Sequence, residues 1–244
     1  MKGKLTVVGF GPGSKEDMTF RAASAIEEAD IVTGYTTYID ILKEFFPGKI
    51  YKSTGMMKEV ERCRMAVEDA MSGKNVAMVS SGDSGIYGMA GIVYQIADEM
   101  GAEIDIETVP GITAASSAAS LLGAPLMHDL ALISLSDLMT PFDLIMKRVD
   151  CAGIGDMVIA FYNPKSKSRT DYLEHAVSVL LKYRSGDTPV GIVRNIGRKD
   201  QKITITTMSR IDYAQVDMFC TVVIGNSQTY VSDGRMITPR GYKI

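Results

Sequence analysis

Short apolar segments without polar alternation recur through the first half of the chain, and they constrain the fold more than any other feature. Four of them are predicted strands: Leu5–Gly9, Ile31–Thr33, Val76–Ser80 and Ile104–Val109. A strand without alternation is typical of burial on both faces, which is the environment of a parallel sheet covered by helices. The first half therefore predicts a parallel α/β domain.

Between these strands, Glu59–Met71 and Ile86–Met100 have the periodicity of helices. The residues predicted to share the buried face of the first helix are Val60, Cys63, Val67, Ala70 and Met71. Gly73 follows this helix as its predicted C-cap, and Gly101 ends the second. A third segment, Gly111–Leu122, is rich in small residues and predicts a tightly packed helix.

The second half of the chain has a different pattern. Its predicted strands are Leu130–Leu135, Met157–Tyr162, Val190–Arg194, Lys202–Thr206 and Thr221–Gly225. The fourth alternates strictly, which predicts one wet face and antiparallel pairing. We therefore expect two α/β domains, residues 1–115 and 116–244, the second with a mixed sheet, and an active site in a cleft between them.

Composition excludes several function classes. The chain has 26 basic and 29 acidic residues in 244, a net charge of −3 that offers no footprint for nucleic acid or an anionic membrane. Three separated cysteines and two histidines predict neither a disulfide framework nor a metal site. No apolar run reaches the ~18 residues of a membrane span. We expect a cytoplasmic protein.

Three predicted strands run into glycine-rich loops, GFGPGS, SSGDSGIYGMAG and VPGITAASS. Loops at the carboxyl ends of parallel strands are where ligands bind in such folds. The first loop does not fit a phosphate: Ser14 replaces the last glycine of the dinucleotide fingerprint, and Pro12 lacks an N–H. These loops therefore predict a ligand that is not held by its phosphates.

Asp83 is the only charged residue between Ser80 and Gly91. An aspartate before a helix is most often a cap or the start of an Asx-turn. The functional alternative is an acceptor for a cationic or ribose-bearing ligand. The residues alone leave both interpretations open.

Basic side chains follow two strands of the second half: Lys165, Lys167, Arg169, Arg194 and Arg198. They are either solvated loop charges or a site for a polycarboxylate or polyphosphate. Serines near His128 do not indicate a hydrolase, because no G-x-S-x-G elbow is present.

Six motifs in order resemble the tetrapyrrole methylase family: VGFGPGS, SGDSGIYGMA, VPGITAASSAASLLGAPLMHDLALISLSDLMTPF, FYNPKSKSR, TPVGIVRNIGR and TVVIGNSQTY. In detail they are similar to its branch that methylates C17 of a precorrin-3-type ring in cobalamin biosynthesis. The resemblance implies a homodimer that binds S-adenosylmethionine between two domains. It also implies a tetrapyrrole substrate and coupling of methylation to ring contraction.

The resemblance also implies site residues. Those expected at the cofactor are Gly11, Pro12, Asp83, Ile86, Tyr87, Thr113, Ala114, Tyr162, Arg194 and Asn195. Acid–base candidates for ring contraction are His128, Asp129, Ser136 and Asp137, and the substrate's carboxylates are assigned to Lys165, Lys167, Arg169 and Arg198. No protein-bound metal is expected. Ser84 stands where the family usually has proline, which we expect to loosen the loop, and Phe142 stands where we expect tryptophan.

Two other readings stay open. A sister methylase could act on another ring carbon or on a protein. A non-catalytic module could sense S-adenosylmethionine or carry a tetrapyrrole, and methyl transfer to a corrin intermediate would exclude it. The sequence leaves open whether the substrate already holds cobalt, because that metal would arrive with the substrate.

Overall fold

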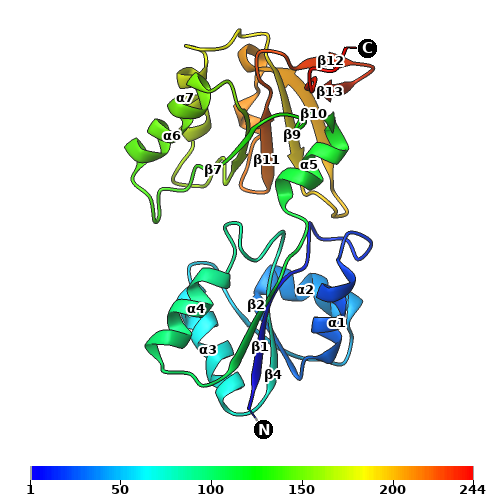
Figure 1. The fold of residues 1–244 in the computed structure, drawn as a ribbon, viewed down its shortest axis with the longest axis vertical. Coiled ribbons are helices and arrows are strands. Elements are labelled where there is room, and N and C mark those ends of the chain that lie inside the picture. Colours follow the sequence, from blue (N-terminus) through cyan, green and yellow to red (C-terminus); the bar gives the residue numbers. More distant parts are fainter. Residues whose placement is uncertain (1, 244) are drawn as a thin grey trace. The chain divides into compact units, whose positions relative to one another are not determined.

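The computed structural model describes residues 2–243, which fall into two units that meet in the sequence at Ala114 and Ala115 (Figure 1). Each unit has its own sheet and its own apolar core. The two are described in turn.

The sheet of the first unit has five parallel strands in the order β3-β2-β4-β1-β5. The strands are β1 (Lys4–Gly9), β2 (Ile31–Tyr35), β3 (Ile50–Thr54), β4 (Asn75–Ser80) and β5 (Asp105–Val109). The predicted parallel sheet is confirmed. Strand β3 was not predicted, because it lies at the edge of the sheet and none of its residues is buried.

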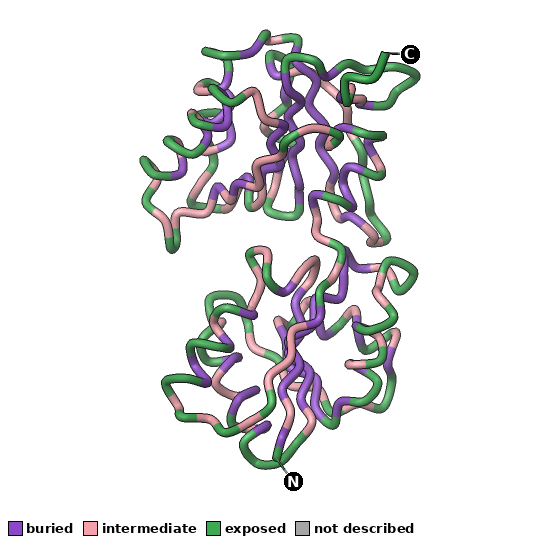
Figure 2. Tube along the Cα trace, viewed as in Figure 1, coloured by how far each residue is buried: buried purple, intermediate pink, exposed green. Residues whose placement is uncertain are grey.

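Helices cover both faces of this sheet (Figure 1). The helices are α1 (Phe20–Glu28), α2 (Thr36–Phe45), α3 (Glu59–Met71) and α4 (Ala90–Glu99). One core forms under α3 and α4, and a second forms under α1 and α2. The central strands are buried along nearly their whole length, as Figure 2 shows, which explains their unbroken apolar sequences.

The buried face of α3 differs from the predicted one. Val60 is 56% exposed and Met71 is 48% exposed, whereas Arg62 and Ala66 are buried. Arg62 can be buried because its guanidinium Nη1 donates to Thr54 Oγ1 at 2.6 Å and to the Gly55 carbonyl at 3.2 Å. A prediction from the apolar residues alone therefore placed the buried face of α3 part of a turn away from its actual position.

The sheet of the second unit has the order β10-β9-β11-β8-β7. Its strands are β7 (Leu130–Ser134), β8 (Val158–Tyr162), β9 (Pro189–Arg194), β10 (Lys202–Thr207) and β11 (Cys220–Ile224). The expected antiparallel pairing is confirmed for β10–β9, β9–β11 and β11–β8, and only β7–β8 is parallel. The alternation of β10 did not predict a buried face, because β10 is an edge strand without a buried residue.

One face of this sheet is covered by α6 (Phe142–Ile154), α7 (Tyr172–Leu180) and two short 3-10 turns, η1 (Met208–Arg210) and η2 (Tyr213–Gln215). Helix α5 (Ala114–Leu122) packs on the other face: a Cβ on Gly191 of β9 would lie 2.4 Å from Leu122 Cδ1. A small sheet of β6 (Gly123–Ala124), β13 (Arg235–Ile237) and β12 (Tyr230–Ser232) lies beyond α5 in the chain. The small residues of α5 thus allow close packing on the sheet.

Candidate functional site

The three glycine-rich loops follow the carboxyl ends of β1, β4 and β5 and meet at one side of the first unit's sheet. We call this side the first edge. Gly11 and Gly82 pair reciprocally: Gly11 N donates to Gly82 O at 3.1 Å, and Gly82 N donates to Gly11 O at 2.7 Å. Both have a positive φ, 81° and 67°, which favours glycine. The first two loops are therefore bound to each other through their backbones.

The third loop packs against the other two with no room for a side chain. A Cβ on Gly111 would lie 2.2 Å from Gly82 O and 2.4 Å from Gly9 O. A Cβ on Gly9 would in turn lie 2.7 Å from Gly82 O. The glycines at these positions are required by backbone contact between loops that are far apart in the sequence.

Asp83 fixes these loops with its carboxylate. Its Oδ1 accepts from Gly85 N at 2.8 Å and Ile86 N at 3.2 Å, and its Oδ2 accepts from Gly111 N at 3.0 Å. Asp83 is not the cap of α4, because that helix begins at Ala90 and its N-cap is Met89. A carboxylate has about four lone-pair sites, so Asp83 retains roughly one for another donor.

The backbone of this edge is poorly suited to phosphate. The N–H groups already occupied by partners inside the loops are those of Gly11, Gly82, Gly85, Ile86 and Gly111. Pro12 has no N–H to offer. A phosphate nest needs several free N–H groups that converge on the anion. The edge instead presents a carboxylate, which fits a ligand with cationic groups and hydroxyls.

Ser84 ties the loop down rather than loosening it, so our expectation for this position was wrong. The residue is fully buried, and its Oγ donates to the Val109 carbonyl at 3.2 Å. The next candidates, Ile86 and Tyr87, lie on the outer part of the loop, and Tyr87 is 52% exposed with a φ of 54°. Because the loop occupies the positions before Ala90, α4 starts at Ala90 and not at Ile86 as predicted.

The remaining candidates of the first unit lie beside the same loop. A Cβ on Gly82 would point to Ala114 N at 3.7 Å and Thr113 Cα at 3.9 Å. The structure thus brings all the first-unit candidates to one edge, although their contacts with a ligand stay predictions. Gly9 and Gly111, which permit this arrangement, were not singled out from the sequence.

In the second unit, β7, β8 and β9 run in the same direction, because β11 is antiparallel to both β8 and β9. Their carboxyl ends therefore form one edge, the second edge. The predicted residues at or after these three ends are Ser136, Asp137, Tyr162, Lys165, Lys167, Arg169, Arg194, Asn195 and Arg198. Most of the second-unit candidates are thus gathered at one end of the sheet.

Two acid–base candidates lie elsewhere. His128 and Asp129 precede β7, and Asp129 O accepts from Val158 N at the start of β8. Ser136 and Asp137 follow the end of the same five-residue strand. At about 3.3 Å per residue the strand separates the two pairs by roughly 17 Å, so they do not form one site within this unit.

Asp137 is held by two neighbours at the second edge. Tyr172 Oη donates to Asp137 Oδ2 at 2.7 Å, and Arg169 Nε lies 3.3 Å from Asp137 Oδ1. Arg169 also donates from Nη1 to the Leu135 carbonyl at 2.9 Å, and its side chain is only 11% exposed. The hydrogen bond to Asp137 raises the pKa of the Tyr172 phenol. Tyr172 was not predicted, and nothing in the sequence indicates its role.

Arg194 is paired as well. Its Nε donates to Asp217 Oδ2 at 2.7 Å, and this bond raises the pKa of the Arg194 guanidinium. Burial alone would raise the pKa of Asp217, but hydrogen bonds from Arg194, the Phe219 N–H and Cys220 outweigh it and lower that pKa. Asn195 N donates to the Phe219 carbonyl at 3.1 Å, which places it beside this pair.

The other second-edge candidates differ in how available they are. Tyr162 Oη accepts from Ala115 N at 2.9 Å, and Lys165 Nζ donates to the Tyr213 carbonyl at 2.9 Å. Arg198 has its Nε buried without a partner among the described residues. Lys167 is exposed and makes no hydrogen bond or ion pair within residues 2–243. It is the most accessible cation of the predicted set.

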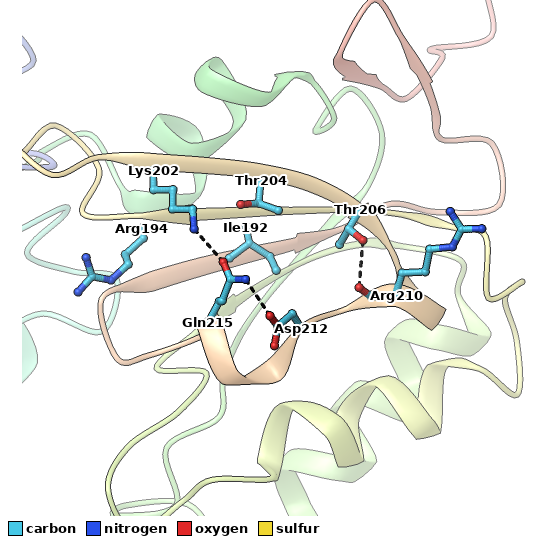
Figure 3. Close-up of a pocket in the computed structure, with 8 residues that line it drawn as sticks. All are labelled: Ile192, Arg194, Lys202, Thr204, Thr206, Arg210, Asp212 and Gln215. Atoms are coloured by element: carbon cyan, nitrogen blue, oxygen red, sulfur yellow. Dashed lines mark hydrogen bonds between the residues drawn. The ribbon is translucent and has the colours of Figure 1, made fainter.

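A polar groove runs along β9 and β10 on the face that carries η1 and η2 (Figure 3). It is lined by Ile192, Arg194, Lys202, Thr204, Thr206, Arg210, Asp212 and Gln215. Lys202 Nζ donates to Gln215 Oε1 at 2.7 Å, and Gln215 Nε2 donates to Asp212 Oδ2 at 2.7 Å. Two of its cations, Arg194 and Lys202, thus already have partners, and we assign the groove no ligand.

Two further features bear on the expected function classes. Within residues 2–243 no helix is long and apolar enough to cross a membrane. The same part of the chain holds no group of three His, Cys, Asp or Glu residues that could bind a metal ion.

Comparison with known proteins gives consistent matches over the whole chain. The family model for Tetrapyrrole (Corrin/Porphyrin) Methylases matches residues 4–212. A probable cobalt-factor III C(17)-methyltransferase from Salmonella typhimurium is 49% identical over 98% of this chain and all of that protein. A precorrin-3B C(17)-methyltransferase from a Sinorhizobium species is 37% identical over 99% of this chain and 98% of its own length.

Solved structures agree with these matches. The crystal structure of the methyltransferase CobJ covers 97% of this chain and all of its own, with a TM-score of 0.91 and 33% identity. The fold is also similar to that of a uroporphyrin-III C-methyl transferase from Thermus thermophilus complexed with S-adenyl homocysteine. That structure has a TM-score of 0.67 and 20% identity, and the match covers 91% of this chain and 92% of that one.

Proposed function

The chain belongs to the tetrapyrrole (corrin/porphyrin) methylases, and we propose that its two sheet edges divide the binding of methyl donor and ring substrate. Its activity is that of a C17-methyltransferase for cobalt-factor III or precorrin-3B in cobalamin biosynthesis. The family uses S-adenosylmethionine as methyl donor. The proposal concerns which residues of this chain do the work.

The first edge binds S-adenosylmethionine. The observation that carries this assignment is the occupation of five of its backbone N–H groups, which leaves the edge with a carboxylate instead of a phosphate nest. S-adenosylmethionine carries no phosphate, and it has an ammonium group, two ribose hydroxyls and a sulfonium. When bound, it supplies a methyl group whose bond to sulfur breaks as the bond to the nucleophilic ring carbon forms, and the sulfur keeps the electron pair.

The protein's own contribution to this step is alignment. An activated methyl donor and an electron-rich ring carbon need no nucleophilic side chain. Holding two reactants in line can lower the barrier by up to ~7–11 kcal/mol. The backbone-to-backbone bonds of Gly11 and Gly82 and the carboxylate of Asp83 give the first edge the rigidity that alignment requires. Tyr87 and Ile86 supply apolar surface that excludes water.

The second edge receives the ring substrate. Lys167 is accessible for the substrate's carboxylates, and Arg198 has a donor without a partner among residues 2–243. Arg169 and Arg194 already pair with Asp137 and Asp217, so neither charge is open to a substrate carboxylate. Ring contraction requires proton movement at oxygen substituents, and we assign it to Ser136, which follows the end of β7 at the same edge.

We further propose that the substrate already carries cobalt. The similarity to the cobalt-factor III relative is higher than to the precorrin-3B relative, 49% against 37% identity, with both matches covering the whole length. The protein is expected to act as a homodimer, and the oligomeric state can be measured by light scattering.

The test is product analysis with both substrates. Purified protein is incubated with S-adenosylmethionine carrying a ¹³C-methyl group and with either cobalt-factor III or metal-free precorrin-3B. We expect the cobalt substrate to gain one methyl group, seen by mass spectrometry, with the label at C17 by NMR. Faster turnover of the metal-free ring would overturn the cobalt proposal, and a label at another ring carbon would overturn the position.

A further inference from the structure

The loop that follows β7 is held by three side chains, two from the segment between β8 and α7 and one from the first residue of α7. Arg169 donates to the Leu135 carbonyl and faces Asp137, and Tyr172 donates to Asp137. Asn163 Nδ2 donates to Ser134 Oγ at 3.0 Å. Residues on both sides of Ser136 are therefore fixed by side chains that are far away in the sequence.

Within this fixed loop, the Ser136 hydroxyl makes no hydrogen bond to any of residues 2–243. Its backbone N–H is held by Ser134 Oγ at 3.3 Å, so the residue's position is set while its side chain stays available. Asp137 is in the opposite situation, because its two oxygens already face a phenol and a guanidinium. A carboxylate whose two oxygens both have such partners is suited to anchoring the loop.

Tyr172 itself is fixed at the start of α7. Its ring packs on Phe142 with centroids 4.6 Å apart, and it also lies against the core of the second unit. The phenol is therefore directed at Asp137 by packing, and the hydrogen bond of 2.7 Å follows from that placement. The two rings, the carboxylate and the guanidinium form one contiguous clamp.

We propose that Tyr172 and Arg169 are positioning residues that hold Asp137 and thereby fix Ser136 as the hydrogen-bond donor to an oxygen substituent of the tetrapyrrole. This inference rests on the proposed function, because it names a role in binding and turning over the ring substrate. It removes Asp137 from the group of acid–base candidates and leaves Ser136 as the residue of this loop that contacts the substrate. It also assigns Arg169 to the loop instead of to a substrate carboxylate.

The test is a double-mutant cycle with a matched control. Tyr172→Phe, Ser136→Ala and the double variant are compared with wild type in kcat, in KM for the ring and in affinity for S-adenosylhomocysteine. Tyr183→Phe is the control, because Tyr183 donates to Asp150 at 2.8 Å in the same unit, and Asp150 lies in the middle of α6. Loss of one hydrogen bond in each variant should lower stability by a similar amount.

We expect Ser136→Ala to lower kcat about tenfold or more, and Tyr172→Phe to lower it about fivefold. The double variant should be no slower than Ser136→Ala, since Tyr172 acts through Ser136. Tyr183→Phe should leave kcat unchanged, and none of the four should change affinity for S-adenosylhomocysteine. Additive losses in the double variant, or an equal kcat loss in Tyr183→Phe, would overturn the proposal.

A pH profile separates anchor from proton carrier. Asp137→Asn keeps an oxygen acceptor for Tyr172 but loses the negative charge that faces Arg169. We therefore expect a lower kcat, because the loop is held less firmly, and an unchanged shape of the kcat–pH profile. Loss of one limb of that profile would assign proton transfer to Asp137 and contradict the inference. If wild type forms no S-adenosylhomocysteine with any ring substrate, the proposed function itself fails, which is a different result from an additive cycle.

Discussion

The carboxyl edges of the two sheets are held together in different ways. At the first edge the loops are joined by backbone bonds between Gly11 and Gly82, and the side chains of Asp83 and Ser84 bond from the loop after β4 to Gly111 and Val109. At the second edge the loops are joined by long side chains, above all Arg169 and Arg194 with their aspartates. At Gly9 and Gly111 the first edge therefore has no room for an added atom, whereas the second edge can lose a side chain and keep its backbone path.

This difference predicts different sensitivities. Backbone contacts depend on shape and are little affected by salt. Ion pairs between partly exposed groups weaken as ions screen them. Substitutions at the first edge should therefore act on cofactor binding independently of salt, and substitutions at the second edge should act on the ring substrate in a way that salt imitates.

The largest effect is expected for Gly111→Ala. The new Cβ would lie 2.2 Å from Gly82 O, a backbone atom that no rotamer change can move. We expect a loss of about 1–3 kcal/mol in the free energy of unfolding. Affinity for S-adenosylhomocysteine should fall by about 100-fold, which corresponds to roughly 2.7 kcal/mol. Urea unfolding and calorimetry measure the two.

Gly91→Ala is the matched control, because nothing lies within 4 Å of a Cβ at that position in the first turn of α4. It should stabilise the protein by up to about 1 kcal/mol and leave affinity unchanged. If Gly111→Ala binds S-adenosylhomocysteine as wild type does, the loops do not need their close contact and the account of the first edge fails.

Asp83→Ala comes next in size. It removes the acceptor of three backbone N–H groups, so we expect ~1.5–3 kcal/mol weaker cofactor binding, or roughly ten- to hundredfold. Asp83→Asn keeps the Oδ1 acceptor but loses the charge, and its cofactor affinity should lie between those of wild type and Asp83→Ala. Wild-type affinity in a folded Asp83→Ala variant would show that the carboxylate neither orders the loop for the ligand nor contacts it.

A smaller effect is expected for Lys167→Ala. Lys167 is exposed and unpaired among the described residues, so its charge is available to a substrate carboxylate. One such contact at a wet site is worth about 0.2–1 kcal/mol. We therefore expect a rise of up to about fivefold in KM for the ring, reproduced in wild type by added salt.

Lys182→Ala serves as its control, since Lys182 follows the end of α7, at the other end of the helix from the second edge. Its steady-state kinetics should match wild type. The pair of lysines Lys165 and Lys167 can also be replaced together, and an unchanged KM that ignores salt would place the substrate elsewhere.

The last prediction concerns the buried thiol of each unit and the rate at which a reagent labels it. Burial raises the pKa of Cys63 and of Cys220 to about 11, while Cys151 is exposed. At pH 8 about 0.1% of a thiol with that pKa is thiolate, so a disulfide reagent should label one thiol per chain rapidly. The labelling rates of Cys63 and Cys220 then compare how readily each unit opens, and rapid labelling of all three would contradict their burial.

The same shifts carry a stability prediction. In the folded protein both thiols have a pKa above the ordinary value of 9.0, so the folded state binds the proton more tightly than the unfolded chain. This contribution is fully present below pH 9 and is lost as the pH rises towards 11. Unfolding midpoints of Cys63→Ala and Cys220→Ala should therefore fall less than that of wild type over this range.

The sequence predicted the parts of the fold that depend on local patterns. Unalternating apolar runs predicted β1, β2, β4 and β5, and strict alternation in β10 predicted antiparallel pairing. Edge strand β3 was not predicted, because none of its residues is buried and its sequence therefore has no clear apolar pattern. The face of α3 was misjudged because Arg62 is buried through bonds to Thr54 and Gly55, which no periodicity reveals.

The same limit applies to the sites. Three glycine loops predicted the first edge, because strand ends of a parallel sheet meet at one side. The Asx-turn of Asp83 was predicted and is confirmed by its bond from Gly85 N. The bond of Asp83 to Gly111 and the roles of Arg169 and Tyr172 could not be predicted, since each depends on a partner between 28 and 35 residues away. The resemblance grouped His128 and Asp129 with Ser136 and Asp137, and the extended strand between them separates the two pairs.

The most direct test of the first edge is its choice of ligand. Wild-type protein is titrated in a calorimeter with S-adenosylhomocysteine, NAD and ATP under identical conditions. Because Pro12 has no N–H and those of Gly11, Gly82 and Gly111 are already bonded, we expect S-adenosylhomocysteine to bind at least about 100-fold more tightly than either phosphate-bearing ligand. Comparable affinity for NAD would mean that the edge does grip phosphate, and it would contradict the account.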